Sequence, residues 1–163
     1  MRHTSSCPGI GGIGCATWSR SLSPPIRATA PGIDSSRRSP LAARVLAELG
    51  GPAVEVRSAG TRDKWVGHPA HTGMVTAAAA AGYDLTAHRG VHLTPGLLDW
   101  ADTVLAMDTG NLAALRALAD EETVPKIGLY LEDRDVPDPW GKEPKAFAAV
   151  VRLIEDGAPR HLP

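Results

Sequence analysis

The residues Arg38-Ser39-Pro40 begin an apolar stripe with helical spacing and predict a helix whose first turn could bind an anion. The stripe is Leu41, Val45, Leu46 and Leu49, and Gly50-Gly51 predicts its end. Free backbone N–H groups, the helix dipole and the Arg38 guanidinium would together attract a phosphate group. Covalent phosphoryl transfer in a Cys-x5-Arg loop would also need a thiolate six residues before the arginine, and that position is Gly32.

The cysteines of the chain do not supply this thiolate. Only Cys7 and Cys15 are present, both in a segment rich in Gly, Ser and Pro. Cys15 precedes Arg20 by five positions rather than six, and Ser21-Leu22-Ser23-Pro24 does not open a helix. With no cysteine elsewhere, the sequence indicates neither a disulfide framework nor a metal cluster, and it favours a reducing, cytoplasmic setting.

Composition excludes several classes of function. The chain has 163 residues, enough for one domain with a sizeable core, and its formal net charge is -1. This charge balance argues against a nucleic-acid or membrane-surface partner, and no apolar run approaches the ~20 residues of a membrane span. His88 and His92 lie at i, i+4 without a third ligand. We therefore expect no metal and a structural hydrogen bond from His88.

The chain divides into two parts of different character. Residues 1–37 show no secondary-structure period and are expected to form an atypical, disordered leader. Residues 38–163 alternate strand and helix patterns, which predicts an α/β domain with a parallel sheet between helices. The strands are expected at 54–57, 103–107 and 126–131. Helices are expected at 70–81, from Thr94-Pro95, from Asp108-Thr109 and up to Gly157.

The sequence offers no clear strand before the anion-binding turn. The segment 24–31 contains Pro24, Pro25 and Pro31. Proline has no N–H to donate to a ladder, so we do not expect this segment to form a central strand. The first strand is therefore predicted to be missing, which would leave a gap in the sheet and a marginally stable fold.

An ordered set of motifs over residues 38–157 resembles the low-molecular-weight protein tyrosine phosphatase family of bacteria. The motifs are Arg38-Ser39-Pro40, Ser58-Ala59-Gly60-Thr61, Trp65-Val66-Gly67, Gly82-Tyr83-Asp84-Leu85, His88-Arg89, 101–108 (ADTVLAMD) and 135–141 (DVPDPWG). The resemblance implies a three-layer α/β fold of the phosphotyrosine phosphatase I type. It also implies phosphomonoester hydrolysis through a cysteinyl phosphate, without metal or organic cofactor, on a phosphotyrosine protein or small aryl phosphate.

The resemblance also implies roles for individual residues. By matching position Arg38 is the phosphate clamp and Asp138 the general acid that protonates the leaving group. Ser39 matches the serine that hydrogen-bonds the nucleophile, and Trp65 and Trp140 match the rims of the aromatic-substrate slot. The alternatives are a surface arginine at a helix start, a turn-forming aspartate, a helix-capping serine and tryptophans that only pack.

The loop departs from the family pattern Cys-x-Gly-Asn-x-Cys-Arg-Ser-Pro. The same positions read Gly32-Ile33-Asp34-Ser35-Ser36-Arg37-Arg38-Ser39-Pro40, so the nucleophile is replaced by Gly32. Loss of a nucleophile costs on the order of 10⁶ in kcat, which predicts an impaired enzyme, a pseudoenzyme candidate. The alternatives are a non-catalytic phosphate- or phosphoprotein-binding module and a defective product of a disrupted reading frame. The altered loop leaves phosphotyrosine and phosphoarginine both open as substrates.

Overall fold

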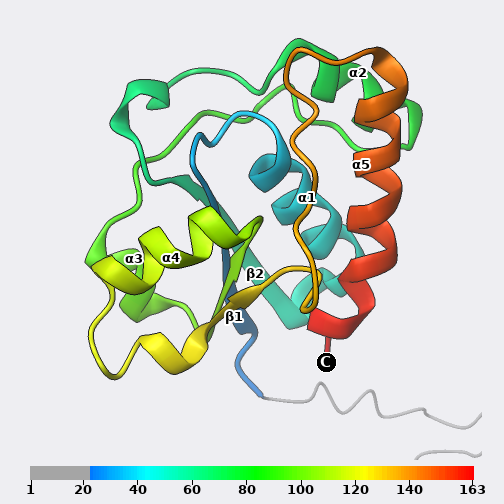
Figure 1. Ribbon diagram of the computed structural model, residues 1–163. Helices are drawn as coiled ribbons and strands as arrows, with labels where there is room; N and C mark the ends of the chain where they lie inside the picture. Colours follow the sequence, from blue (N-terminus) through cyan, green and yellow to red (C-terminus); the bar gives the residue numbers. More distant parts are fainter. Residues whose placement is uncertain (1–22) are drawn as a thin grey trace, which may run out of the picture.

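The computed structural model describes residues 23–163, whose strands form one parallel sheet with helices on both faces (Figure 1). The sheet has four strands in the order β2-β1-β3-β4. Their bounds are β1 Ile26–Gly32, β2 Val54–Gly60, β3 Thr103–Ala106 and β4 Ile127–Leu129. The three-layer α/β fold expected from the sequence is confirmed.

The helices cover the sheet in two groups (Figure 1). On one face lie α1 Arg38–Gly50, α2 Thr72–Ala80 and α5 Pro144–Gly157. On the other lie α3 Pro95–Trp100 and α4 Thr109–Leu118. Short 3-10 turns are η1 Gly51–Ala53, η2 Asp63–Trp65, η3 Val124–Lys126 and η4 Ala158–His161. No helix in residues 23–163 is both long and apolar enough to cross a membrane.

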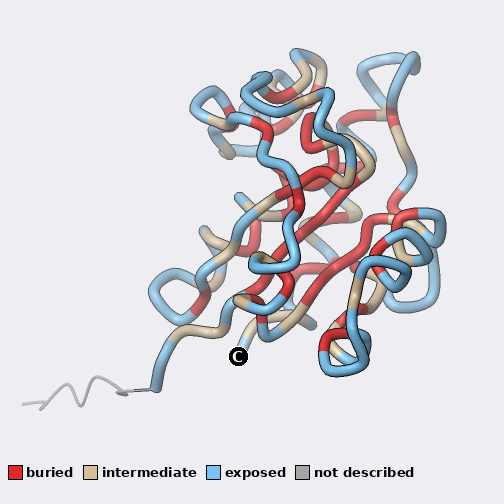
Figure 2. Tube along the Cα trace, turned by 90° about the vertical axis from the view of Figure 1, so that its left-hand side faces the viewer, coloured by how far each residue is buried: buried red, intermediate tan, exposed pale blue. Residues whose placement is uncertain are grey.

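Side chains that alternate along the strands build one core on each face of the sheet. Ala30 and Leu105 pack in the cluster under α1, α2 and α5, whereas Val104 and Ala106 pack in the cluster under α3 and α4. Figure 2 shows this pattern as buried chain running through the middle of the molecule. The sheet is therefore buried on both faces, as expected for parallel strands joined by helices.

The expectation of a missing first strand is wrong. Residues 26–32 form β1, which lies inside the sheet and pairs with β2 along its whole length, from Ile26↔Val54 to Gly32↔Gly60. It also pairs with β3 at Ala28↔Thr103 and Thr29↔Val104. The folded unit therefore begins before residue 38, and the predicted leader 1–37 is too long by at least this strand. Cys7 and Cys15 lie outside the described residues.

Pro31 is accommodated because its nitrogen faces the side of β1 on which pairing has already ended. The carbonyl of Gly32 accepts a hydrogen bond from Thr61 N–H, on the β2 side. Consecutive residues of a strand direct their N–H and C=O groups to opposite sides, so the Pro31 nitrogen faces β3. The β1–β3 register ends at Thr29↔Val104, two residues earlier. No ladder donor is lost at Pro31, and a proline is tolerated inside the sheet.

The predicted helix starts agree with the structure. Thr94 caps α3 by accepting a hydrogen bond from Leu97 N–H, and Asp108 caps α4 by accepting one from Asn111 N–H. The helix predicted over 70–81 spans Thr72–Ala80, and His71, not a hydroxyl residue, caps it. The helix predicted to end at Gly157 does so.

Candidate active site

The loop 33–37 joins the carboxyl end of β1 to the start of α1, which is where parallel α/β sheets bind ligands. Backbone carbonyls of the loop are held by groups outside it. Thr61 N–H donates to Gly32 O at 2.9 Å, Arg62 N–H to Ile33 O at 3.2 Å and His71 N–H to Ser36 O at 2.7 Å. By contrast, no N–H group of residues 33–36 donates a hydrogen bond to any described residue. Those donors remain free for an anion.

His88 supports the loop from behind. Its Nε2 lies 2.6 Å from the Ser35 carbonyl oxygen, so the predicted structural hydrogen bond of His88 is confirmed. Burial lowers the pKa of His88, against the raising effect of the bond to Ser35. The ring therefore favours the neutral form, which donates from Nε2. No three His, Cys, Asp or Glu side chains of the described chain gather in a way that could hold a metal.

Arg38 begins α1 and is buried, with its guanidinium already engaged. Nη1 donates to the Val136 carbonyl at 2.5 Å and Nη2 donates to Asp108 Oδ2 at 2.7 Å. Arg38 is therefore a buried residue and not the surface arginine that the alternative interpretation expected. Its predicted role of binding a phosphate group stays a prediction, because these two contacts already use N–H donors of the guanidinium.

Sequence reasoning missed the second function of Asp108. One of its carboxylate oxygens caps α4, which the sequence predicts, while the other binds Arg38. The available signal was that a capping carboxylate uses only one oxygen and leaves the second free for an arginine. Asp108 lies two residues after the end of β3, so its place at the carboxyl edge of the sheet brings it to the arginine.

Arg37, at the family's second cysteine position, joins two carboxylates at the mouth of the loop. Its Nη2 lies 2.6 Å from Asp34 Oδ2 and 3.1 Å from Asp138 Oδ2, and its Nε lies 2.9 Å from Asp138 Oδ1. Ser36 Oγ donates to Asp34 Oδ1 at 2.8 Å. The substituted loop residues therefore form an ion-pair network of their own, which the motif order did not predict.

This network changes the protonation of Asp138. Burial raises the pKa of its carboxyl, but hydrogen bonds from Arg37 and from Trp140 N–H, with the charges of Arg37 and Arg38, outweigh burial. The pKa of Asp138 lies below its ordinary 3.8. A general acid must hold a proton at the working pH. The contacts of Asp138 therefore favour its ionised form, and its role as the general acid stays a prediction.

Gly32, at the end of β1, lies next to Ser39, in the first turn of α1. An ideal Cβ on Gly32 would lie 3.2 Å from Ser39 Oγ and 2.9 Å from the Asp34 carbonyl oxygen. Ser39 is fully buried, and its hydroxyl has no hydrogen-bond partner. It does not cap α1, whose N-cap residue is Arg37 without a side-chain bond. The hydroxyl thus faces the side that a longer residue at position 32 would fill.

The two tryptophans differ in their surroundings. Trp140 is 66% exposed, and its backbone N–H donates to Asp138 Oδ1 at 3.1 Å, so it stands at the mouth of the site. Trp65 is half-buried in η2, where Lys64 Nζ lies 5.2 Å from its ring centroid. Its ring also meets His68 edge-on, with ring centroids 5.6 Å apart. Trp140 therefore lies beside Asp138, the predicted general acid. The contacts of Trp65 are those of a side chain that packs against its neighbours.

A loop with free N–H groups between the first strand and the first helix of a parallel sheet is typical of phosphate-binding α/β proteins. Within that class, the family model for low molecular weight phosphotyrosine protein phosphatase matches residues 33–162. The Etp low molecular weight protein-tyrosine-phosphatase of Escherichia coli K12 is 35% identical over 120 residues, which cover 72% of this chain and 80% of Etp. The chain belongs to the low molecular weight phosphotyrosine protein phosphatase family.

Solved structures agree with this assignment. Wzb of Vibrio vulnificus in complex with benzylphosphonate superposes with a TM-score of 0.77 at 28% identity, over 83% of this chain and 96% of Wzb. The YwlE arginine phosphatase of Geobacillus stearothermophilus superposes with a TM-score of 0.78 at 27% identity, over 84% of this chain and 90% of YwlE. The family match begins at Ile33, directly after Gly32.

Proposed function

We propose that this chain is a member of the family in which hydrolysis through a cysteinyl phosphate is lost. The observation that carries the proposal is Gly32 at the junction of β1 and the loop, six residues before Arg38. A covalent mechanism needs a nucleophile at that junction to displace the leaving group from phosphorus. Glycine has no side chain, and the Ser39 hydroxyl beside it is hydrogen-bonded to no base.

Protonation of the leaving group, which accompanies the attack on phosphorus in the first step, is also impaired in this proposal. The leaving phenolate needs a proton, and Asp138 is bound to Arg37 in its ionised form. Loss of both the nucleophile and the acid predicts activity at the level of non-specific hydrolysis.

The test is hydrolysis of p-nitrophenyl phosphate by the full chain and by Arg38→Ala. Equal rates support the proposal, because an arginine that stabilises no transition state can be removed without loss. Turnover that exceeds the variant's and is blocked by iodoacetate at Cys7 or Cys15 would overturn it.

A second candidate is binding of a phosphate group without turnover, which the free N–H groups of the loop favour. The ligand class would be a phosphotyrosine protein, a small aryl phosphate or a phosphoarginine protein, in keeping with the phosphatases similar to this chain. Both arginines beside the loop already form ion pairs with carboxylates, Arg37 with Asp34 and Asp138, and Arg38 with Asp108. The affinity of the loop for a dianion would therefore be weak. We place this function in the cytoplasm, because the cysteine usage favours a reducing compartment.

The binding test is a titration of the isotope-labelled chain with benzylphosphonate and with phosphotyrosine. Shifts of the amide signals of residues 33–36 that are lost in Arg38→Ala would support binding. Unchanged signals at millimolar ligand would exclude it. A defective product of a disrupted reading frame stays the third alternative.

A further inference from the structure

The free edge of β2 presents backbone groups that no described residue uses. The N–H of Gly60 donates to Val91 O, and the C=O of Gly60 accepts from Leu93 N–H, both at 2.8 Å. Gly60 therefore faces away from β1. Because residues of a strand alternate in direction, Val56 and Ser58 also face away from β1. No hydrogen bond to their outward N–H and C=O groups is found within residues 23–163.

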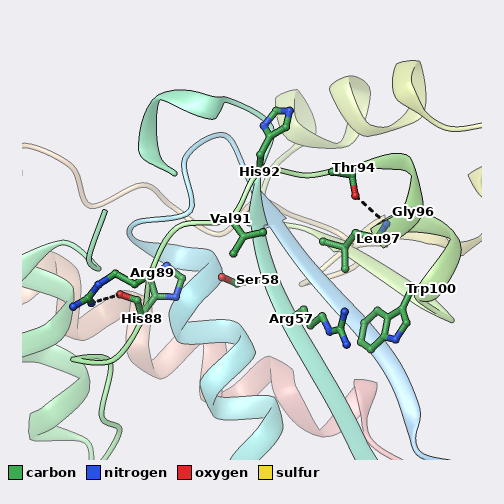
Figure 3. Close-up of a pocket in the computed structure, with 10 residues that line it drawn as sticks. All are labelled: Arg57, Ser58, His88, Arg89, Val91, His92, Thr94, Gly96, Leu97 and Trp100. Atoms are coloured by element: carbon green, nitrogen blue, oxygen red, sulfur yellow. Dashed lines mark hydrogen bonds between the residues drawn. The ribbon is translucent and has the colours of Figure 1, made fainter. Parts of the chain in front are cut away.

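Two grooves flank this edge, one on each face of the sheet. The first has a volume of about 610 Å³ and the second about 320 Å³. Ser58 and His88 line both grooves. Figure 3 shows the first groove with Arg57 and Trp100 on one side, Arg89 on the other and Ser58 between them. The side chains of a strand added to this edge would point alternately into the two grooves.

The first groove is basic. Its lining includes the arginines Arg57 and Arg89, which supply the positive charge, and no carboxylate. Arg89 donates only to the carbonyls of Thr86 and His88, so no described carboxylate neutralises it. Arg57 lies over the Trp100 ring at 4.1 Å and pairs with Glu55 at 3.0 Å. Both members of that pair are about half exposed, so a partner's carboxylate can compete with Glu55.

The second groove has both apolar and polar walls, and the polar lining residues include the carboxylate Asp84, which would repel an acidic side chain. Its walls include Pro40, Ala43 and Ala47 of α1, Val56 of β2 and Leu85. The one arginine in it, Arg44, is paired with Glu48 at 2.5 Å. Small apolar side chains fit this lining better than charged ones.

We infer that the free edge of β2 binds an extended, acidic segment of a partner protein as an added strand. Its backbone pairs with Val56 and Ser58, its acidic side chains face Arg57 and Arg89, and its alternate side chains are small and apolar. Main-chain pairing supplies affinity in such complexes, and the alternating pockets supply specificity. The inference stands apart from the proposed function, because the groups that it uses lie on β2 and not in the loop.

A second copy of β2 is the less favoured occupant. The face of β2 directed to the basic groove carries one Glu and one Arg, Glu55 and Arg57. Such a strand would add as much positive as negative charge to a site that needs negative charge. Charged residues also commonly protect edge strands from self-pairing.

The test uses the full chain and an acetylated, amidated seven-residue peptide that alternates Glu and Val. We expect saturable binding by calorimetry and shifts of the amide signals of Val56, Arg57 and Ser58. The same peptide with Lys for Glu should bind at least tenfold more weakly. Ser58→Pro removes an outward N–H without removing a β1 ladder bond and should weaken binding at least tenfold, while Ser58→Ala should not.

If Ser58→Pro fails to fold, two peptides N-methylated at adjacent residues replace it. One should lose at least tenfold in affinity and the other should not, because only alternate N–H groups face β2. No binding at millimolar peptide, binding unchanged in Ser58→Pro, or shifts confined to Arg37 and Arg38 would each overturn the inference. A dimer in sedimentation that Ser58→Pro dissociates would also overturn it, in favour of a second copy.

Discussion

Arg37 Nε donates to Asp138 Oδ1 at 2.9 Å, and this contact joins the loop between β1 and α1 to the residue that the sequence predicts as the general acid. The residues are 101 apart in sequence. A neutral side chain at position 37 would remove the hydrogen bonds and the charge of Arg37, which lower the pKa of Asp138. The guanidinium instead stabilises the carboxylate. One substitution in the loop thus affects the acid as well as the anion-binding site.

Arg37→Met should raise the pKa of Asp138. The substitution removes the hydrogen bonds and the charge that lower this pKa, while burial continues to raise it. The measurement is a carboxyl carbon titration of the labelled chain by NMR. Arg44→Met, which breaks only the exposed pair with Glu48, is the matched control and should leave Asp138 unchanged. An Asp138 pKa that is the same in Arg37→Met and in the unmodified chain would contradict the assigned cause.

Replacement of the whole loop should create phosphatase activity that Gly32→Cys alone does not. A Cβ at position 32 would lie 2.9 Å from the backbone oxygen of Asp34, so the single variant must displace the loop. Adding Asp34→Gly, Ser35→Asn and Arg37→Cys rebuilds the family sequence and frees Asp138. We expect a burst of p-nitrophenol followed by turnover in this fourfold variant.

The same variant tests Asp138 and Ser39. Adding Asp138→Asn should slow aryl phosphate hydrolysis by roughly 10²–10⁴, the usual contribution of a positioned acid. Adding Ser39→Ala should raise the pKa of the new thiol in an iodoacetamide pH profile, since the free hydroxyl would donate to the thiolate. A fourfold variant that folds and shows no activity would remove these residues from the inherited mechanism.

Sequence patterns predicted most elements of the fold because helix caps and apolar spacing are local signals. Thr94 and Asp108 cap the helices predicted for them, and Gly157 ends α5. The strand β1 was missed because the penalty for Pro31 depends on which side of the strand its nitrogen faces. The penalty also depends on where the β1–β3 pairing ends, and both are tertiary properties that leave no local signal.

The candidate site was predicted in part. Motif order assigned Arg38 and Asp138 roles in one site, and the structure brings both to the loop. The pairing of Arg37 with Asp34 and Asp138 was not predicted, because the partners are three and 101 residues away and no spacing rule links them. The partner of Arg38, Asp108, was recognised only as a helix cap.

Thr29→Val should stabilise the protein by about 1 kcal/mol. Thr29 is fully buried in β1, and its hydroxyl has no hydrogen-bond partner. Burial of an unsatisfied hydroxyl costs on the order of 1–3 kcal/mol, and valine has nearly the same shape. Urea unfolding measures the difference, with exposed Thr76→Val as a control expected near zero. A large loss of stability in Thr29→Val would show that β1 is not buried between β2 and β3.

Stability should fall as the pH is lowered through the histidine range. Burial lowers the pKa of His88 and of His161 below the ordinary 6.5, so folding favours their neutral forms. The unfolded chain then binds more protons than the folded chain below about pH 6.5, and stability decreases as pH falls toward the folded pKa values. His88→Gln can keep a donor to Ser35 O and does not titrate, so its urea midpoint should depend less on pH between about 7 and 5. A slope equal to that of the unmodified chain would mean that His88 is not held in its neutral form beside the loop.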